Sequence, residues 1–140
     1  MHIAIINGPN LNLLGTREPE VYGSQTFEEY FKELQHKYPA IKFSYFQSNI
    51  EGELISEVQK MGVESDGVLL NAAAFTHTSI GLGDAISAIK TPVVEIHISN
   101  IYAREEYRHH SYLTGKCVGV ISGLGLKGYE LGVEYLKCEM

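Results

Sequence analysis

Residues 92–98 read Pro92-Val-Val-Glu-Ile-His-Ile98, a short run in which β-branched residues dominate. Such a run is typical of a strand that is buried on both faces of a parallel sheet. Four similar apolar runs occur elsewhere in the chain, at residues 2–7, 41–47, 67–71 and 117–122. The sequence therefore predicts five buried strands.

Amphipathic segments separate these runs. Thr26 and Glu29 have the spacing of a capping box, and apolar residues recur at helical spacing until Pro39, which cannot continue a helix. The same periodicity returns before Gly62, before Pro92 and near the C-terminal end, in residues 54–61, 80–89 and 126–136. The alternation predicts an α/β fold: a doubly wound, five-stranded parallel sheet with three layers (α/β/α), formed by one domain across residues 1–140. Ligands of this architecture bind beyond the carboxyl ends of the strands.

The composition excludes several classes of protein. No apolar run approaches the ~20 residues of a membrane helix, and a net charge of −6 without runs of Lys or Arg argues against nucleic-acid binding. The first residues lack the basic region and long apolar stretch of a secretory signal, so we expect a cytoplasmic protein. Cys117, in a predicted core strand, and Cys138, near the C-terminal end, are expected to be free thiols in a reducing compartment.

Polar residues gather where the predicted strands end, and the pair Glu95 and His97 stands out among them. Residues two apart in a strand lie on the same side, so the Glu95 carboxylate can orient the His97 imidazole as a general acid. The alternative is a structural pair at the edge of the sheet. The other polar residues of this group are Asn7, Asn10, Asn71 and Ser99.

The segment from Gly15 to Gly23 is too long for a minimal turn, and we interpret it as a lid with a glycine hinge at each end. It contains Arg17 and Tyr22. The pKa of a phenol, about 10, must fall by about 3 for half of it to be ionised at pH 7, which requires about 4 kcal/mol. A guanidinium at ~4 Å supplies about that much at an effective dielectric constant near 20. Arg17 can therefore make Tyr22 a base in a closed, dry site; the alternative is a solvated loop.

For two further pairs of residues the sequence allows two interpretations each. His77 and Asp84 offer hydrogen-bonding side chains around a helix start, or serve only as capping and surface groups. Arg104 and Arg108 are four residues apart, which would place both on one helical face suited to an anion or to hydroxyls. The alternative for the arginines is pairing within the helix with the glutamates between them.

Two sequence patterns do not support a bound metal or dinucleotide. The histidines at positions 77, 97, 109 and 110 lack any established metal-binding spacing, so we expect no metal. Gly123, Gly125 and Gly128 match the Gly-x-Gly-x-x-Gly dinucleotide pattern, which needs a second strand with an acidic residue about 20 positions on. The twelve residues after Gly128 do not supply one. We expect these glycines to allow close packing of the last helix on the sheet.

Three blocks of sequence together resemble type II 3-dehydroquinate dehydratase, over essentially the whole chain. They are residues 7–23 (Asn7-Gly-Pro-Asn-Leu-Asn-Leu-Leu-Gly-Thr-Arg-Glu-Pro-Glu-Val-Tyr-Gly23), residues 75–79 (Phe75-Thr-His-Thr-Ser79) and residues 95–108, which contain Glu95-Ile-His-Ile-Ser-Asn100 and Arg104-Glu-Glu-Tyr-Arg108. The resemblance implies a flavodoxin-like fold and trans dehydration of 3-dehydroquinate to 3-dehydroshikimate through an enolate, in the shikimate pathway of aromatic amino acid biosynthesis, without a cofactor or metal.

The resemblance also implies a role for each catalytic residue. Tyr22 would take the proton alpha to the ketone, with Arg17 lowering its pKa, and His97 would protonate the departing hydroxyl. Asn10 would position the water or the enolate oxygen, and Glu95 would orient His97. A base, an acid and an oxyanion stabiliser are what such an elimination needs. The rival hypothesis is a non-catalytic, flavodoxin-like module that binds a small anion.

For the substrate, the resemblance implies that Asn71 and the backbone amides of Ile98 and Ser99 bind the carboxylate. The ring hydroxyls would be bound by His77, Arg108 and Asp84, with Asp84 reaching the site of a neighbouring subunit in a homododecamer built from trimers. Two features depart from the family pattern. Ala72 and Ala73 stand where the family commonly has Pro or Gly, and Gly81 and Gly83 are expected to make the next helix start flexible. We expect these departures to affect the rigidity of the pocket more than the chemistry.

Overall fold

The computed structural model describes residues 1–16, 20 and 24–140. Its five strands form one sheet in the order β2-β1-β3-β4-β5, and every neighbouring pair is parallel. The strands are β1 (His2–Asn7), β2 (Lys42–Gln47), β3 (Gly67–Asn71), β4 (Val93–His97) and β5 (Gly119–Ser122). The five predicted strands are confirmed, but β5 begins after Cys117, so that cysteine lies in the preceding loop and not in a core strand.

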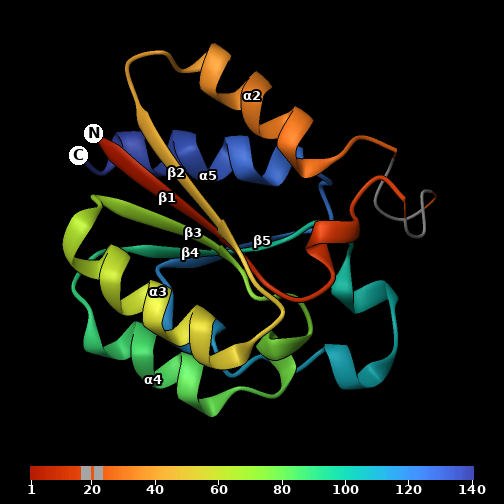
Figure 1. Cartoon of the computed structure of the whole chain (residues 1–140). Helices are drawn as coiled ribbons and strands as arrows, with labels where there is room; N and C mark the ends of the chain where they lie inside the picture. Colours follow the sequence, from red (N-terminus) through yellow and green to blue (C-terminus); the bar gives the residue numbers. More distant parts are fainter. Residues whose placement is uncertain (17–19, 21–23) are drawn as a thin grey trace.

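Helices cover both faces of the sheet, as predicted (Figure 1). Helices α2 (Phe27–Lys37) and α5 (Lys127–Cys138) lie on one face, and α3 (Glu51–Glu64) and α4 (Ile80–Ala88) lie on the other. Alternate residues of β1 serve the two layers: Ile3 and Ile5 pack in the core under α2 and α5, and Ile6 packs in the core under α3 and α4. Burial on both faces explains why the strands read as continuous apolar runs. Within the described residues, no helix combines the length and hydrophobicity that a membrane span requires.

The helix ends follow the predicted signals in part. The Thr26 hydroxyl accepts from the Glu29 amide (3.2 Å) at the start of α2, and the helix stops before Pro39. The expectation that Gly62 ends the next helix is wrong, because α3 continues to Glu64. A Cβ at Gly62 would overlap the side chain of Ile89, so this glycine permits contact between α3 and the end of α4.

Helix α4 starts regularly, although we expected a flexible start. The Ser79 hydroxyl caps it by accepting from the Leu82 amide (2.9 Å). Gly83 is buried, and a Cβ there would lie 2.8 Å from the carbonyl oxygen of Tyr112. Glycine therefore stands at this position because the backbone of the 111–118 loop passes close to the helix.

The connections that follow β1, β3 and β4 contain short 3₁₀ turns. They are η1 (Leu11–Leu13), η2 (Ala73–His77), η3 (Ile101–Ala103), η4 (Glu106–Arg108) and η5 (Thr114–Lys116). The predicted single helical face for Arg104 and Arg108 is wrong, since extended backbone at Arg104 separates η3 from η4. The Asn100 side chain starts η3 by accepting from the Tyr102 amide (3.1 Å), which favours a short local turn over a longer helix.

The glycines after β5 have structural roles. Gly123 and Gly125 adopt positive φ angles of 90° and 63°, and their amides donate to the carbonyls of His97 (3.1 Å) and Ile98 (3.0 Å). A Cβ at Gly128 would contact Ile121 and Ile96 at 3.4 and 3.5 Å, so α5 packs closely on the sheet. The packing explanation is therefore confirmed for Gly128, whereas the first two glycines are needed for the turn that ties β5 to the end of β4.

Candidate active site

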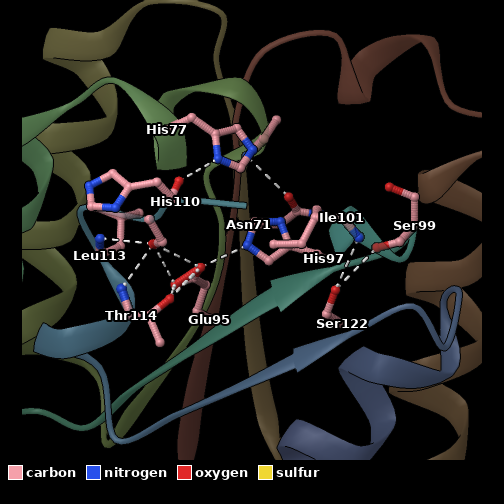
Figure 2. A network of polar contacts seen from close by, with 12 residues as sticks. Asn71, His77, Glu95, His97, Ser99, Ile101, His110, Leu113, Thr114 and Ser122 are labelled. Atoms are coloured by element: carbon pink, nitrogen blue, oxygen red, sulfur yellow. Dashed lines mark hydrogen bonds and ion pairs between the residues drawn. The ribbon is translucent and has the colours of Figure 1, made fainter. Parts of the chain in front are cut away.

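A pocket opens at the carboxyl ends of β1, β3 and β4, where the architecture places ligands. Its wall combines apolar side chains with polar groups that converge from three loops, and Figure 2 shows the polar network on one side of it. The lining residues are Pro9, Asn10, Leu11, Leu13, Leu14, Asn71, Ala73, Ala74, His77, His97, Ile98, Ser99, Ile101, Arg104 and Arg108.

Glu95 and His97 form the pair that strand periodicity predicts. His97 Nε2 lies 2.7 Å from Glu95 Oε2, and the two residues are 4% and 0% exposed. Their strand, β4, lies between β3 and β5, so the pair does not lie at an edge of the sheet. The carboxylate also accepts from the hydroxyls of Thr114 (2.6 Å) and Ser111 (3.2 Å).

These hydrogen bonds decide the charge of Glu95. Burial alone raises the pKa of its carboxyl, but the hydrogen bonds from His97, Thr114 and Ser111 outweigh burial and hold the pKa below its ordinary value. An ionised carboxylate only accepts, so His97 Nε2 must carry a hydrogen. The other ring nitrogen, Nδ1, is then left for the pocket that His97 lines. The arrangement suits a general acid held by an anion behind it.

His77 stacks on His97, with ring centroids 6.3 Å apart and an angle of 19° between the planes. His77 Nδ1 lies 2.7 Å from the carbonyl oxygen of His110, which can only accept. Burial lowers the pKa of His77 and electrostatic interactions with His97 and Arg108 lower it further, although the His110 carbonyl and the charge of Glu95 act in the opposite direction. A neutral ring with its hydrogen on Nδ1 leaves Nε2 as an acceptor, which suits a hydroxyl donor.

Asn71 is fixed by a network that reaches across the sheet. Its Nδ2 donates to the Tyr129 hydroxyl (3.0 Å), its Oδ1 accepts from the Ala73 amide (3.1 Å), and Tyr129 in turn donates to Asn7 Oδ1 (2.7 Å). Asn71 is 3% exposed and lines the pocket. One Nδ2 hydrogen remains, so Asn71 offers a donor to an anion or to another acceptor.

The loop that carries Asn10 is anchored to the neighbouring strand. Asn10 has a positive φ of 69°, and its amide donates to the Asn49 side chain (3.0 Å). Gln47, at the end of β2, donates to the Gly8 carbonyl (3.1 Å) and to Asn49 Oδ1 (3.1 Å). These contacts hold Asn10 at the pocket rim.

The structure brings most of the remaining predicted residues together. Ile98, Ser99 and Arg108 line the pocket, and Arg108 also pairs with Glu105 (2.6 Å), as the alternative reading of that arginine expected. Asp84 is exposed on α4 and does not line the pocket. Arg17 and Tyr22 lie outside the described residues. Within residues 1–16, 20 and 24–140, no three His, Cys, Asp or Glu side chains are grouped as a metal site requires.

Sequence reasoning missed two sets of residues at the site. Ser111 and Thr114 contact Glu95 from 16 and 19 positions away, and no periodic pattern relates residues so separated. The apolar wall formed by Leu11, Leu14 and Ile101 was visible only as hydrophobic residues in loops, which is an unusual place for them.

Comparisons with known proteins agree with this geometry. Residues 1–137 match the family model described as dehydroquinase class II. The 3-dehydroquinate dehydratase of Photorhabdus laumondii subsp. laumondii is 50% identical over 135 residues, which cover 95% of this chain and 90% of that protein. The 3-dehydroquinate dehydratase of Prochlorococcus marinus (strain MIT 9515) is 51% identical over 143 residues, which cover 98% of each.

Solved structures give the same result. The type II dehydroquinase from Butyrivibrio crossotus superposes with a TM-score of 0.94 at 38% identity, and the match covers 98% of this chain and 97% of that one. A 3-dehydroquinate dehydratase-like protein from Bifidobacterium longum superposes with a TM-score of 0.70 at 25% identity, over 97% and 94% of the two chains. The chain therefore belongs to the class II dehydroquinase family.

Proposed function

We propose that this chain catalyses the trans elimination of water from 3-dehydroquinate, giving 3-dehydroshikimate through an enolate, as a step of the shikimate pathway. The family match and the names of relatives at about half identity support this reaction. In the structure, the main support for this reaction is the His97–Glu95 pair. A buried, ionised carboxylate holds an imidazole whose free nitrogen faces the pocket.

The elimination divides into two proton transfers. Tyr22, with Arg17 beside it, takes the proton alpha to the ketone, and the electrons of the C–H bond form an enolate whose oxygen Asn10 helps to position. The enolate then expels the beta hydroxyl while His97 Nδ1 gives that oxygen a proton, so the C–O bond breaks and water leaves. Proton transfer from Tyr22 back to His97 resets the site.

Substrate binding follows from the donors and acceptors around the pocket. The remaining Nδ2 hydrogen of Asn71, with the amides of Ile98 and Ser99, receives the substrate carboxylate. Neutral His77 accepts from a ring hydroxyl through Nε2, and Arg108 donates to another. Each group then meets a partner of opposite hydrogen-bonding character, which discriminates strongly against analogues that lack the hydroxyls.

Asp84 belongs to a wider proposal about assembly. Its exposed position on α4, away from the pocket of its own chain, is compatible with a role in a neighbouring subunit's site. We therefore propose that residues 1–140 form one catalytic domain, which assembles into a homododecamer built from trimers. We propose that this enzyme is cytoplasmic and needs no cofactor. Size-exclusion chromatography with light scattering tests the assembly, and Asp84→Ala is expected to weaken substrate binding in the oligomer.

An absorbance assay for the conjugated enone product tests the function directly. Purified protein with 3-dehydroquinate is expected to form the product, and Tyr22→Phe and His97→Ala are each expected to abolish turnover while substrate binding, measured by calorimetry, largely survives. A non-catalytic anion-binding module would give no product at high protein concentration, and Tyr22→Phe would leave its binding unchanged.

A further inference from the structure

Three donors converge on Glu95, and only one of them belongs to the proposed acid. His97 Nε2 donates to Oε2 (2.7 Å), whereas Thr114 Oγ1 lies 2.6 Å from Oε1 and 3.2 Å from Oε2. Ser111 Oγ lies 3.2 and 3.3 Å from the two oxygens. Figure 2 shows the Glu95 carboxylate between His97 on one side and the 111–114 turn on the other.

The geometry fixes the direction of the Ser111 hydrogen. Ser111 Oγ accepts from the amides of Leu113 (2.9 Å) and Thr114 (3.0 Å), which occupy its lone pairs. Its own hydrogen can then only point to Glu95. Two backbone amides thus polarise the Ser111 hydroxyl toward the carboxylate, and hydrogen bonds in such a chain strengthen one another.

The acid step changes what Glu95 faces. Before the step, the carboxylate lies against an imidazolium; after Nδ1 has given its proton to the leaving hydroxyl, the same carboxylate lies against a neutral ring. Glu95 is 0% exposed, so no bulk water can replace the lost charge. An ionised group in that position persists only if other donors satisfy it.

We propose that Ser111 and Thr114 are positioning residues that keep Glu95 ionised after His97 has lost its proton, and so make His97 an effective acid. The inference rests on the proposed function. Without these hydroxyls, the state with neutral His97 and charged Glu95 is destabilised more than the state with both charges. The pair then holds its proton more tightly, its titration midpoint moves to higher pH, and proton donation slows.

Among the described residues, the other titratable groups near the pair include His77, Arg104 and Arg108 in the pocket lining and Cys117 near Glu95. The pKa of His77 is lowered, chiefly by burial, and burial together with the charge of Glu95 raises the pKa of the Cys117 thiol to about 12. Arg108 stays charged throughout and pairs with Glu105. In the described part of the chain, the flanking strands β3 and β5 contribute only Asn71 and Ser122 as polar side chains. His77 stacks on His97 and interacts with it electrostatically, so both rings are followed in the titration.

The test is the titration of His97, followed by NMR of its ring in the substrate-free protein, together with the pH dependence of kcat. In Thr114→Val the midpoint is expected to rise by about one pH unit, since a hydrogen bond to a charged group is lost, and kcat is expected to fall about tenfold. Ser111→Ala is expected to act in the same direction. Thr114→Ser keeps the hydroxyl and is expected to stay within about 0.3 pH unit of the wild type.

A matched control, Thr91, lies just before the start of β4. The Thr91 hydroxyl donates to the Gly62 carbonyl (2.8 Å), remote from Glu95, so Thr91→Val removes a threonine hydroxyl without touching the carboxylate. This variant is expected to leave the His97 midpoint unchanged. If Thr114→Val does not fold, as judged by circular dichroism, Ser111→Ala takes its place with the same expected direction.

The outcomes separate this proposal from the proposed function. A folded Thr114→Val or Ser111→Ala protein whose His97 midpoint matches the wild type overturns the positioning role, whatever the turnover. If the midpoint is raised in the variant and the wild-type protein forms no enone product, the positioning role is supported and the proposed function is contradicted. A raised midpoint with slower turnover, restored by Thr114→Ser, supports both.

Discussion

Two buried polar networks meet at the pocket, and they differ in how completely their groups are paired. Around Glu95, both carboxylate oxygens accept hydrogen bonds, from His97, Thr114 and Ser111. Under α5, Tyr129 joins Asn7 to Asn71, yet Asn7 Nδ2 has no hydrogen-bond partner among the described residues. The contrast follows from charge, because an unpaired buried ion costs far more than an unpaired amide.

The difference between the networks also indicates what each one does. The Glu95 network stabilises a charge whose partner changes during the proposed reaction. The Tyr129 network instead fixes the orientation of the Asn71 side-chain amide. One Nδ2 hydrogen of that amide is left as a donor for the pocket. Removing a group from the Glu95 network should therefore lower the free energy of unfolding more than removing one from the Tyr129 network.

The largest effect is expected from Glu95→Leu. The change leaves the buried donor of His97 and the part-buried hydroxyls of Ser111 and Thr114 without their acceptor, so we expect a loss of about 3 kcal/mol in the free energy of unfolding, together with loss of turnover. Urea unfolding monitored by circular dichroism measures the stability. Adding Thr114→Val to Glu95→Leu removes one of the orphaned donors, so the double variant should recover part of the loss. A double variant no more stable than Glu95→Leu alone would contradict this account of the network.

Tyr129→Phe is expected to cost less, about 1–3 kcal/mol, because it leaves the Asn7 oxygen and an Asn71 hydrogen unpaired while the ring still fills its site. The freed Asn71 amide should also raise KM with little change in kcat. Tyr30→Phe is the matched control: its ring packs 6.0 Å from that of Tyr129, but its hydroxyl has no partner among the described residues. Equal losses in the two variants, measured by urea unfolding, would show that the Tyr129 hydrogen bonds contribute nothing.

Sequence reasoning recovered what depends on local periodicity. The five strands were predictable because each is a β-branched run buried on both faces, and the Glu95–His97 pair followed from the two-residue repeat of a strand. The start of α2 was predictable because the Thr26 hydroxyl bonds an amide three residues away. Each of these signals lies within a few residues of the feature it predicts.

Features that depend on distant partners were not predictable. Gly62 lies inside α3 because of Ile89, and the regular start of α4 depends in part on the passage of Tyr112 near Gly83. Ser111 and Thr114 meet Glu95, and Tyr129 meets Asn7, only once the sheet has formed. These contacts are properties of the packed chain, and no spacing in the sequence encodes them.

Ala73→Gly tests backbone strain beside the uncharged Tyr129 network, and its expected effect on stability is about 1 kcal/mol or less. Ala73 adopts a φ of 52°, a left-handed conformation that costs an L-residue about 1–2 kcal/mol, whereas glycine adopts it freely but loses about 0.5–1 kcal/mol of chain entropy. We expect a small net gain in stability. Ala74→Gly is the control, because Ala74 lies in the same 3₁₀ turn without a positive φ and should lose stability. A scanning calorimeter measures both, and a loss in Ala73→Gly equal to that in Ala74→Gly would exclude strain at Ala73.

The smallest effect is expected at His77, which lies between the two networks: it stacks on His97 and ends the turn that begins at Ala73. Its pKa in the folded protein is lowered from 6.5, chiefly by burial, so the unfolded chain binds the proton first as the pH falls. The resulting stabilisation is fully present above about 6.5 and is lost as the pH falls toward the folded value. His77→Gln should therefore show a smaller drop in Tm between pH 7.5 and 5.5 than the wild type, whereas His36→Gln, exposed on α2, should not. Identical pH dependence in the wild type and His77→Gln would mean that His77 binds its proton equally well in the folded and the unfolded chain. The folded ring could not then serve as a neutral acceptor beside His97.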